Sequence, residues 1–192
     1  MKDSDLKNII SLMLRNKDLL TELLDRFDPE DIERGFLLIP QNMINCDLKM
    51  LIMDKTAPFL NDYRIIFDQG SIYLDLDING EQLGRLKAKY MLTIDDFAFG
   101  GNIHRIGLSY REDVKSEGNF MQNMAIKAAG LKGSYLQTAV GIAKLDFIHA
   151  EKGYAIINLD QIAALKKIPS SLKLAYTNCE NGKLKLRFTL EE

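Results

Sequence analysis

The chain has 192 residues and a mass of 21.8 kDa, which is typical of a single domain able to bury its own core. Its composition, 46% hydrophobic and 27% charged, excludes a disordered chain. The formal net charge of −2 argues against a dedicated nucleic-acid binder. Two widely spaced cysteines, Cys46 and Cys179, indicate neither a disulfide framework nor a zinc site.

The first residues do not resemble a signal peptide. Asp3, Asp5, Lys7 and Arg15 interrupt the apolar stretch that such a peptide needs. The sequence also has no run of about 20 apolar residues, the length that a membrane-spanning helix requires. We therefore expect a cytoplasmic protein with no transmembrane segment and with reduced thiols.

Residues 1–60 are predicted to be mainly helical. Apolar residues recur at helical spacing over the first 35 positions: Leu6, Ile9, Ile10, Met13, Leu20, Leu23, Leu24 and Phe27. Asp28-Pro29 then begins a short helix that Gly35 ends. Residues 42–55 fit a helix better than a strand, although 48–53 could form either.

From Tyr63 onward the apolar residues alternate, which predicts antiparallel strands. Ile72, Leu74, Leu76 and Ile78 share one face, and Asn79-Gly80 suits a tight hairpin turn. A bulge at Gly84 would then set Leu74 opposite Leu86 and Asp75 opposite Arg85.

A second change of phase falls at Asp95-Asp96, where the inward positions shift from Ile94 to Phe97 and Phe99. Gly100-Gly101-Asn102 then turns the chain. Three-residue hairpin loops are expected within 150–154 and 179–183. In the second hairpin, Leu172, Leu174 and Tyr176 should oppose Leu190, Phe188 and Leu186.

The longest predicted helix spans about 120–142 and is almost free of charge. One stripe is apolar, with Met124, Ala128, Leu131, Tyr135 and Ile142, and a second consists of small residues, with Ala125, Ala129, Gly133 and Gly141. Glycine inside a helix costs about 1 kcal/mol, so the small stripe predicts close approach of another backbone. A short helix is expected over 160–167.

These elements predict an α+β fold of one domain, 1–192. N-terminal helices precede strongly bent antiparallel β-meanders, over 61–192, that wrap around one long central helix.

Several motifs have a functional and a structural interpretation. DLDINGE, residues 75–81, imitates the start of a calcium loop, but Leu86 stands where the bidentate glutamate belongs, so an ordinary hairpin is favoured. His104 and His149 belong to no metal-binding motif. A basic strand face indicates either solvated edges or an anionic partner such as phospholipid head groups: Arg85, Lys87, Lys89, Lys173, Lys183, Lys185 and Arg187.

The arrangement of a long apolar helix against bent strands resembles the tubular lipid-binding (TULIP) superfamily. The stretches that carry this resemblance include IIFDQGSIYLDLDI, GRLKAKYMLTI, FMQNMAIKAAGLKGSYLQTAVGI, HAEKGYAIINLDQI and ENGKLKLRFTL, between Ile65 and Leu190. The hairpin style is similar to small bacterial members. The resemblance implies binding of lipid acyl chains between helix and sheet.

We therefore expect a non-enzymatic protein that binds an apolar ligand, an acyl chain first, between the long helix and the sheet. The candidate ligand-lining residues are Phe120, Met124, Leu131 and Tyr135, facing Leu74, Leu76, Tyr90 and Phe99. The alternative is a structural or interaction module with a filled core that dimerises or docks through its N-terminal helices. No cofactor, metal or nucleic acid is expected, and an enzyme ranks third, but peripheral membrane contact remains open.

Overall fold

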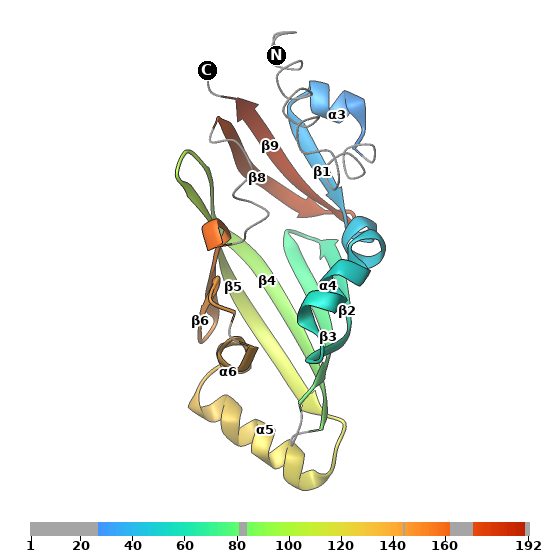
Figure 1. Cartoon of the computed structure of the whole chain (residues 1–192), viewed down its shortest axis with the longest axis vertical. Helices are drawn as coiled ribbons and strands as arrows, with labels where there is room; N and C mark the ends of the chain where they lie inside the picture. Colours follow the sequence, from blue (N-terminus) through green and yellow to red (C-terminus); the bar gives the residue numbers. More distant parts are fainter. Residues whose placement is uncertain (1–26, 81–83, 144, 162–170, 191–192) are drawn as a thin grey trace.

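A computed structural model describes residues 27–80, 84–143, 145–161 and 171–190. Its nine described strands form one antiparallel sheet in the order β1-β9-β8-β4-β5-β7-β6; β3 also pairs with β4, and β2 pairs with β3 (Figure 1). The strands are β1 (Phe36–Pro40), β2 (Leu60–Asp68), β3 (Ser71–Asn79), β4 (Arg85–Gly100), β5 (Ile103–Ser116), β6 (Ile148–Glu151), β7 (Tyr154–Asn158), β8 (Leu172–Glu180) and β9 (Lys183–Leu190).

The β4–β5 hairpin contains the two longest strands and lies at the centre of this sheet. A two-residue turn joins the strands, because Gly100 pairs with Ile103 and Gly101 adopts a φ of 62°. The register shifts between Ile94 and Asp96, which confirms the predicted change of phase. Residues 85–92 of β4 pair with β3, whereas Phe99 pairs with Leu174 of β8. Along the same edge, β4 therefore pairs first with β3 and then with β8.

The β8–β9 hairpin has the predicted register, with Leu172, Leu174 and Tyr176 opposite Leu190, Phe188 and Leu186. Its loop is shorter than expected: Glu180 pairs with Lys183, and Asn181 and Gly182 both have positive φ, as a type I′ turn requires. The β6–β7 loop is also shorter, because Glu151 pairs with Tyr154.

The predicted register of β3 against β4 is wrong. Leu74 faces Tyr90 rather than Leu86, and Asp75 faces Lys89 rather than Arg85. The reason is the loop, which spans Gly80 to Gly84, closed by a 2.8 Å hydrogen bond from Gly80 N to Gly84 O, so Asn79-Gly80 is no two-residue turn. Since both registers pair even-numbered positions, the apolar side chains still share one face.

Short helices accompany the sheet: α3 (Pro29–Glu33), a π-helical turn (Met43–Asp47), α4 (Lys49–Thr56), α5 (Phe120–Lys132), α6 (Tyr135–Ala143) and a 3-10 turn (Leu159–Gln161). The Asp28 cap before α3 and the helical state of most of 42–55 confirm the sequence prediction. The strand β1 was not predicted. The helix expected over residues 1–26 and most of the one over 160–167 lie outside the described residues.

The predicted central helix is wrong, and with it the α+β fold wrapped around that helix. The chain breaks at Gly133-Ser134 into α5 and α6. Ser134 begins the second helix, since its Oγ accepts a hydrogen bond from Gln137 N at 3.2 Å. The helix α5 lies at one end of the sheet, and α6 lies next to β6 (Figure 1).

The glycines of the small-residue stripe have no backbone close to them. A Cβ at Gly133 would have one neighbour within 4 Å, Gln137 Oε1 at 3.5 Å, which is an ordinary van der Waals contact. Gly141 has nothing within 4 Å of its Cβ position. The stripe therefore does not mark close approach of another backbone. No described helix has the length and apolar character needed to cross a membrane.

Candidate functional site

The strands β3, β4 and β5 present a continuous apolar face. Its buried members are Ala88, Tyr90 and Tyr110, together with Ala150 and Ala155 from β6 and β7. Around them, the half-buried side chains are Leu74, Leu76, Ile78, Leu92 and Val114, with Leu136 and Val140 from α6. We call this set the apolar face.

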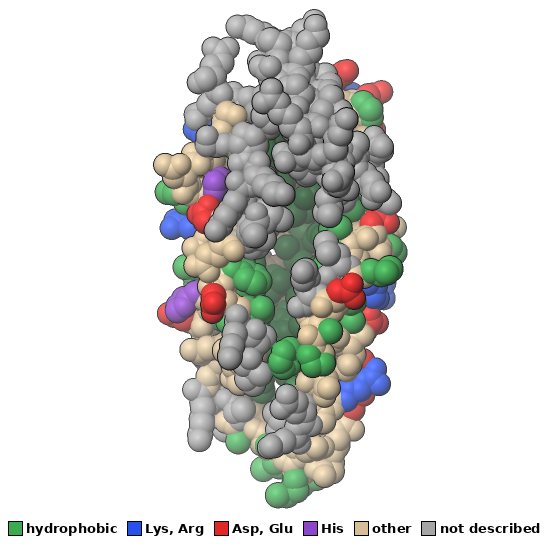
Figure 2. All heavy atoms as spheres, viewed as in Figure 1, with side chains coloured by type: hydrophobic (Ala, Val, Ile, Leu, Met, Phe, Trp, Pro, Cys, Tyr) green, Lys and Arg blue, Asp and Glu red, His purple; other side chains and the backbone are tan. Residues whose placement is uncertain are grey.

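Coverage of the apolar face is incomplete within the described part of the chain. Leu136 and Val140 of α6 pack against it, yet the leucines of β3 and β4 remain only half-buried. Figure 2 shows a lengthwise hollow lined with hydrophobic side chains between the two sides of the molecule. An apolar surface that is concave and partly covered is what a binding site for an apolar ligand requires.

A carboxylate interrupts the apolar face. Glu112 lies opposite Tyr90 and has the same orientation as Tyr110 and Val114, because side chains two apart on a strand share a face. Its two oxygens accept hydrogen bonds from Tyr135 N at 2.9 Å and Leu136 N at 3.1 Å. Glu112 thus satisfies free N–H groups at the start of α6, where a negative charge is stabilising.

Tyrosine hydroxyls add further hydrogen bonds near Glu112 and the start of α6. The Tyr110 hydroxyl bonds with Ser134 Oγ and donates to Glu151 O at 2.5 Å, while Tyr135 donates to Ile126 O at 2.5 Å. Burial raises the pKa of Tyr90, Tyr110 and Tyr135, and the nearby Glu112 carboxylate raises each of them further. These phenols therefore stay neutral; Tyr110 links the start of α6 to the sheet, and Tyr135 links α6 to α5.

The structure brings together only part of the predicted lining set. Leu74, Leu76 and Tyr90 belong to the apolar face. Phe99 is buried nine positions further along β4, about 30 Å away at 3.3 Å per residue, where its ring meets His104.

The helix residues of that set lie elsewhere. Phe120 and Met124 are exposed on α5, and Tyr135 stands at the break between the helices. The side chain of Leu131 lies outside the described part of the structure. Glu112, Leu136 and Val140 were missed, although a glutamate between Tyr110 and Val114 on an apolar strand face was a visible signal.

The opposite face of the same strands is charged. Arg64, Asp75, Lys89 and Asp113 lie side by side across β2, β3, β4 and β5, so their charges alternate. We call this side the charged face. It includes the two aspartates of the calcium-like motif, and Asp75 is exposed on it.

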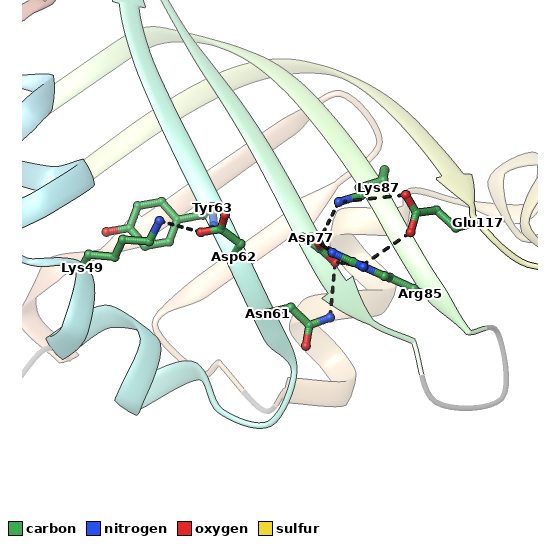
Figure 3. Close-up of polar contacts among 8 residues, drawn as sticks. All are labelled: Lys49, Asn61, Asp62, Tyr63, Asp77, Arg85, Lys87 and Glu117. Carbon is green, nitrogen blue, oxygen red and sulfur yellow. Dashed lines mark hydrogen bonds and ion pairs between the residues drawn. The ribbon is translucent and has the colours of Figure 1, made fainter.

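Asp77, the second of these aspartates, is buried under cations (Figure 3). Its carboxylate accepts hydrogen bonds from Arg85 Nε at 2.8 Å, Lys87 Nζ at 2.6 Å and Asn61 Nδ2 at 3.2 Å. Arg85 above all holds the pKa of Asp77 well below its usual range. Glu117 also pairs with both cations. Ion pairs therefore occupy the carboxylate that the calcium interpretation would need.

The basic side chains predicted to form one face lie in two places, on β4 and on the β8–β9 hairpin. Arg85 and Lys87 pair with Asp77 and Glu117, and Lys89 lies between Asp75 and Asp113. On β9, Lys185 Nζ stands 4.0 Å from the centre of the Phe36 ring. The cations of β4 therefore serve the sheet itself.

The remaining polar candidates show no arrangement for catalysis. His104 Nδ1 contacts Asp160 Oδ1 at 2.5 Å, and His149 Nε2 lies 3.4 Å from Glu151 Oε1 on the surface. Cys179 is buried, which raises the pKa of its thiol to about 11. No group of three or more metal-ligating side chains occurs among the described residues. Nothing in the described ranges of the chain indicates an enzyme.

Two shallow depressions lie away from the apolar face. One, of about 360 Å³, is lined by Phe99 and Leu174 with Lys173 and Arg187 at its rim. The other, of about 440 Å³, reaches Tyr90 from the charged face, between Lys89 and Arg111. Both are lined by charged as well as apolar side chains, and the second includes the acidic Asp75, Glu112 and Asp113.

Comparison with protein-family models, curated proteins and solved structures gives no match. The resemblance to the tubular lipid-binding superfamily therefore stays a prediction, and the long helix that was part of it is wrong.

Proposed function

We propose that this protein is a non-enzymatic binder of an apolar ligand, an acyl chain of a lipid, held on the apolar face rather than beside a long helix. The observation that carries the proposal is the half-buried state of Leu74, Leu76 and Leu92 on the inner side of a nine-stranded sheet. Burying such side chains fully is worth about 1.5–3 kcal/mol each, so a ligand that covers them gains binding energy.

The composition of the apolar face supports this choice of ligand. Aliphatic and small side chains dominate it, and its carboxylate and tyrosine hydroxyls are engaged by α6 and by backbone groups. Few polar groups remain to orient a polar ligand, whereas a flexible hydrocarbon needs only shape and apolar area. A concave, mostly apolar wall is the usual setting for such binding.

Native mass spectrometry of freshly purified full-length protein tests the proposal. We expect an adduct with the mass of a fatty acid or lipid, and saturable binding of a fluorescent fatty acid once that adduct is removed. The proposal fails if no adduct is found and the fluorescent fatty acid shows no saturation. In that case the apolar face is simply core, as the interaction-module interpretation requires.

A further inference from the structure

The helix α5 exposes its apolar side chains at one end of the molecule (Figure 1). Phe120 is 76% exposed, Met121 74% and Met124 50%. Ala125 and Ala128 are exposed as well, and spacings of three and four residues place all five along one edge of the helix. We call this set the α5 edge.

Hydrogen bonds fix the helix with this edge outward. A capping box joins Asn119 and Gln122, each side chain bonding the other's backbone N–H at 3.0 Å. Ser116 N, at the end of β5, donates to Asn123 Oδ1 at 3.2 Å. Ile126 is buried on the inner side of the helix. The end of the sheet therefore holds the α5 edge in its exposed orientation. The exposure does not result from fraying of the helix.

The helix α5 itself carries charges of a single sign, and Glu117, which precedes its cap, pairs with Arg85 and Lys87. The sequence contains no acidic residue between Glu117 and Asp146, although the chain as a whole has a net charge of −2. Lys127 is exposed on α5, and Lys132 ends the same helix. A helix whose sequence combines exposed apolar side chains with lysine and contains no carboxylate is typical of helices that lie in the interface of an anionic membrane.

We propose that the α5 edge docks the protein onto an anionic phospholipid surface, with Phe120, Met121 and Met124 inserted among the lipids. The three exposed side chains present about 400 Å², which is below the roughly 800 Å² that each partner of a stable dimer buries. A second copy would also bring Lys127 toward its own counterpart, which is repulsive. The membrane accommodates both the small area and the positive charge.

Fluorescence offers a direct test, because the chain contains no tryptophan. Phe120→Trp places a single tryptophan on the α5 edge. Met50→Trp is the matched control, since Met50 is 78% exposed on α4. We expect the emission of Phe120→Trp to shift to shorter wavelength with vesicles of phosphatidylcholine and phosphatidylglycerol, and less with phosphatidylcholine alone. Met50→Trp should not shift.

Cosedimentation with the same vesicles gives the second measurement. Replacing Phe120, Met121 and Met124 together by serine should lower the fraction bound by about tenfold or more, whereas Met50→Ser leaves it unchanged. Equal binding by both variants, or no vesicle binding by the wild type, overturns the proposal. So does a dimer that only the triple variant dissociates, because the edge would then belong to a second copy. The vesicles carry no fluorescent fatty acid, so this inference and the proposed function can fail separately.

Discussion

The two faces of β3, β4 and β5 are built from alternate residues of the same strands, yet their states differ. On the charged face, Arg64, Asp75, Lys89 and Asp113 alternate in sign across neighbouring strands, and Asp77 is enclosed by Arg85 and Lys87. The apolar face is only partly covered, since its leucines stay half-buried beneath α6.

This difference indicates which of the two faces can still gain free energy by binding a ligand. On the charged face, the buried Asp77 carboxylate already has Arg85 and Lys87 as partners, so an added cation would have to displace them. Half-buried leucines have not lost all contact with water, so an apolar ligand still has something to gain. Because successive side chains of a strand point to opposite faces, the charged and the apolar side chains lie on different sides of the sheet.

The largest effect is expected on the charged face, from Asp77→Asn. Arg85, Lys87 and Asn61 all donate hydrogen bonds to this buried carboxylate, so the variant should lose about 2 kcal/mol of unfolding free energy at pH 7. Urea unfolding measures the loss. Asp75→Asn, on the same strand and exposed, is the matched control and should change stability little.

The difference in stability between wild type and Asp77→Asn should also depend on pH, in a known direction. Because the pKa of Asp77 is lowered in the folded state, its carboxylate stabilises the protein above the unfolded aspartate pKa of about 3.9 and ceases to do so as the pH falls through the folded value. The difference between wild type and Asp77→Asn should therefore be full at pH 7 and shrink below about pH 4. A difference that stays constant down to pH 2 would contradict this account of Asp77.

A smaller effect is expected on the apolar face, from Glu112→Gln. The substitution removes the charge that accepts from Tyr135 N and Leu136 N, and a lost helix N-terminal partner costs about 1 kcal/mol. Urea unfolding should show this loss. Hydrogen exchange should show faster exchange at the first amides of α6, with the amides of β3 unaffected. Exchange that is uniformly unchanged would mean that the helix does not depend on this carboxylate.

The smallest effect is expected from Asp113→Asn. Asp113 is the next residue to Glu112 and points to the opposite face, where it pairs with Lys115 at 2.8 Å in an exposed position. Exposed ion pairs contribute little to stability, so the urea unfolding curve should stay where it is. A loss as large as that of Glu112→Gln would remove the distinction between the two faces.

How far the sequence predicted the structure depended on whether the interactions were local. The register of β8 against β9 was predicted correctly from the alternating apolar residues, although the loop is one residue shorter than expected, because a bulge between Tyr176 and Asn178 offsets the difference. The loop of β3–β4 was wrong because Gly80 and Gly84, rather than Asn79 and Gly80, close it. β1 was missed because its partner β9 lies about 150 residues away.

The break in the predicted long helix had a local and a distant cause. Ser134 followed by Gln137 is a helix-start signal that could have been read. The partner of the new helix end, Glu112, lies on another element, and no periodicity within 120–142 reveals it. The same limit applies to the site: Leu74, Leu76 and Tyr90 followed from strand alternation, whereas the outward side of α5 depends on how the helix is attached.

A matched pair on β4 tests the central claim most directly. Leu92 lies on the apolar face and Met91, its neighbour, on the opposite one, and both are half-buried. Titrating a fluorescent fatty acid should show weaker binding by Leu92→Gln, by roughly five- to tenfold, and unchanged affinity for Met91→Gln. Thermal unfolding and a Leu92→Met variant with normal affinity would exclude general loss of structure. Equal affinities for the two glutamine variants would contradict ligand binding on the apolar face.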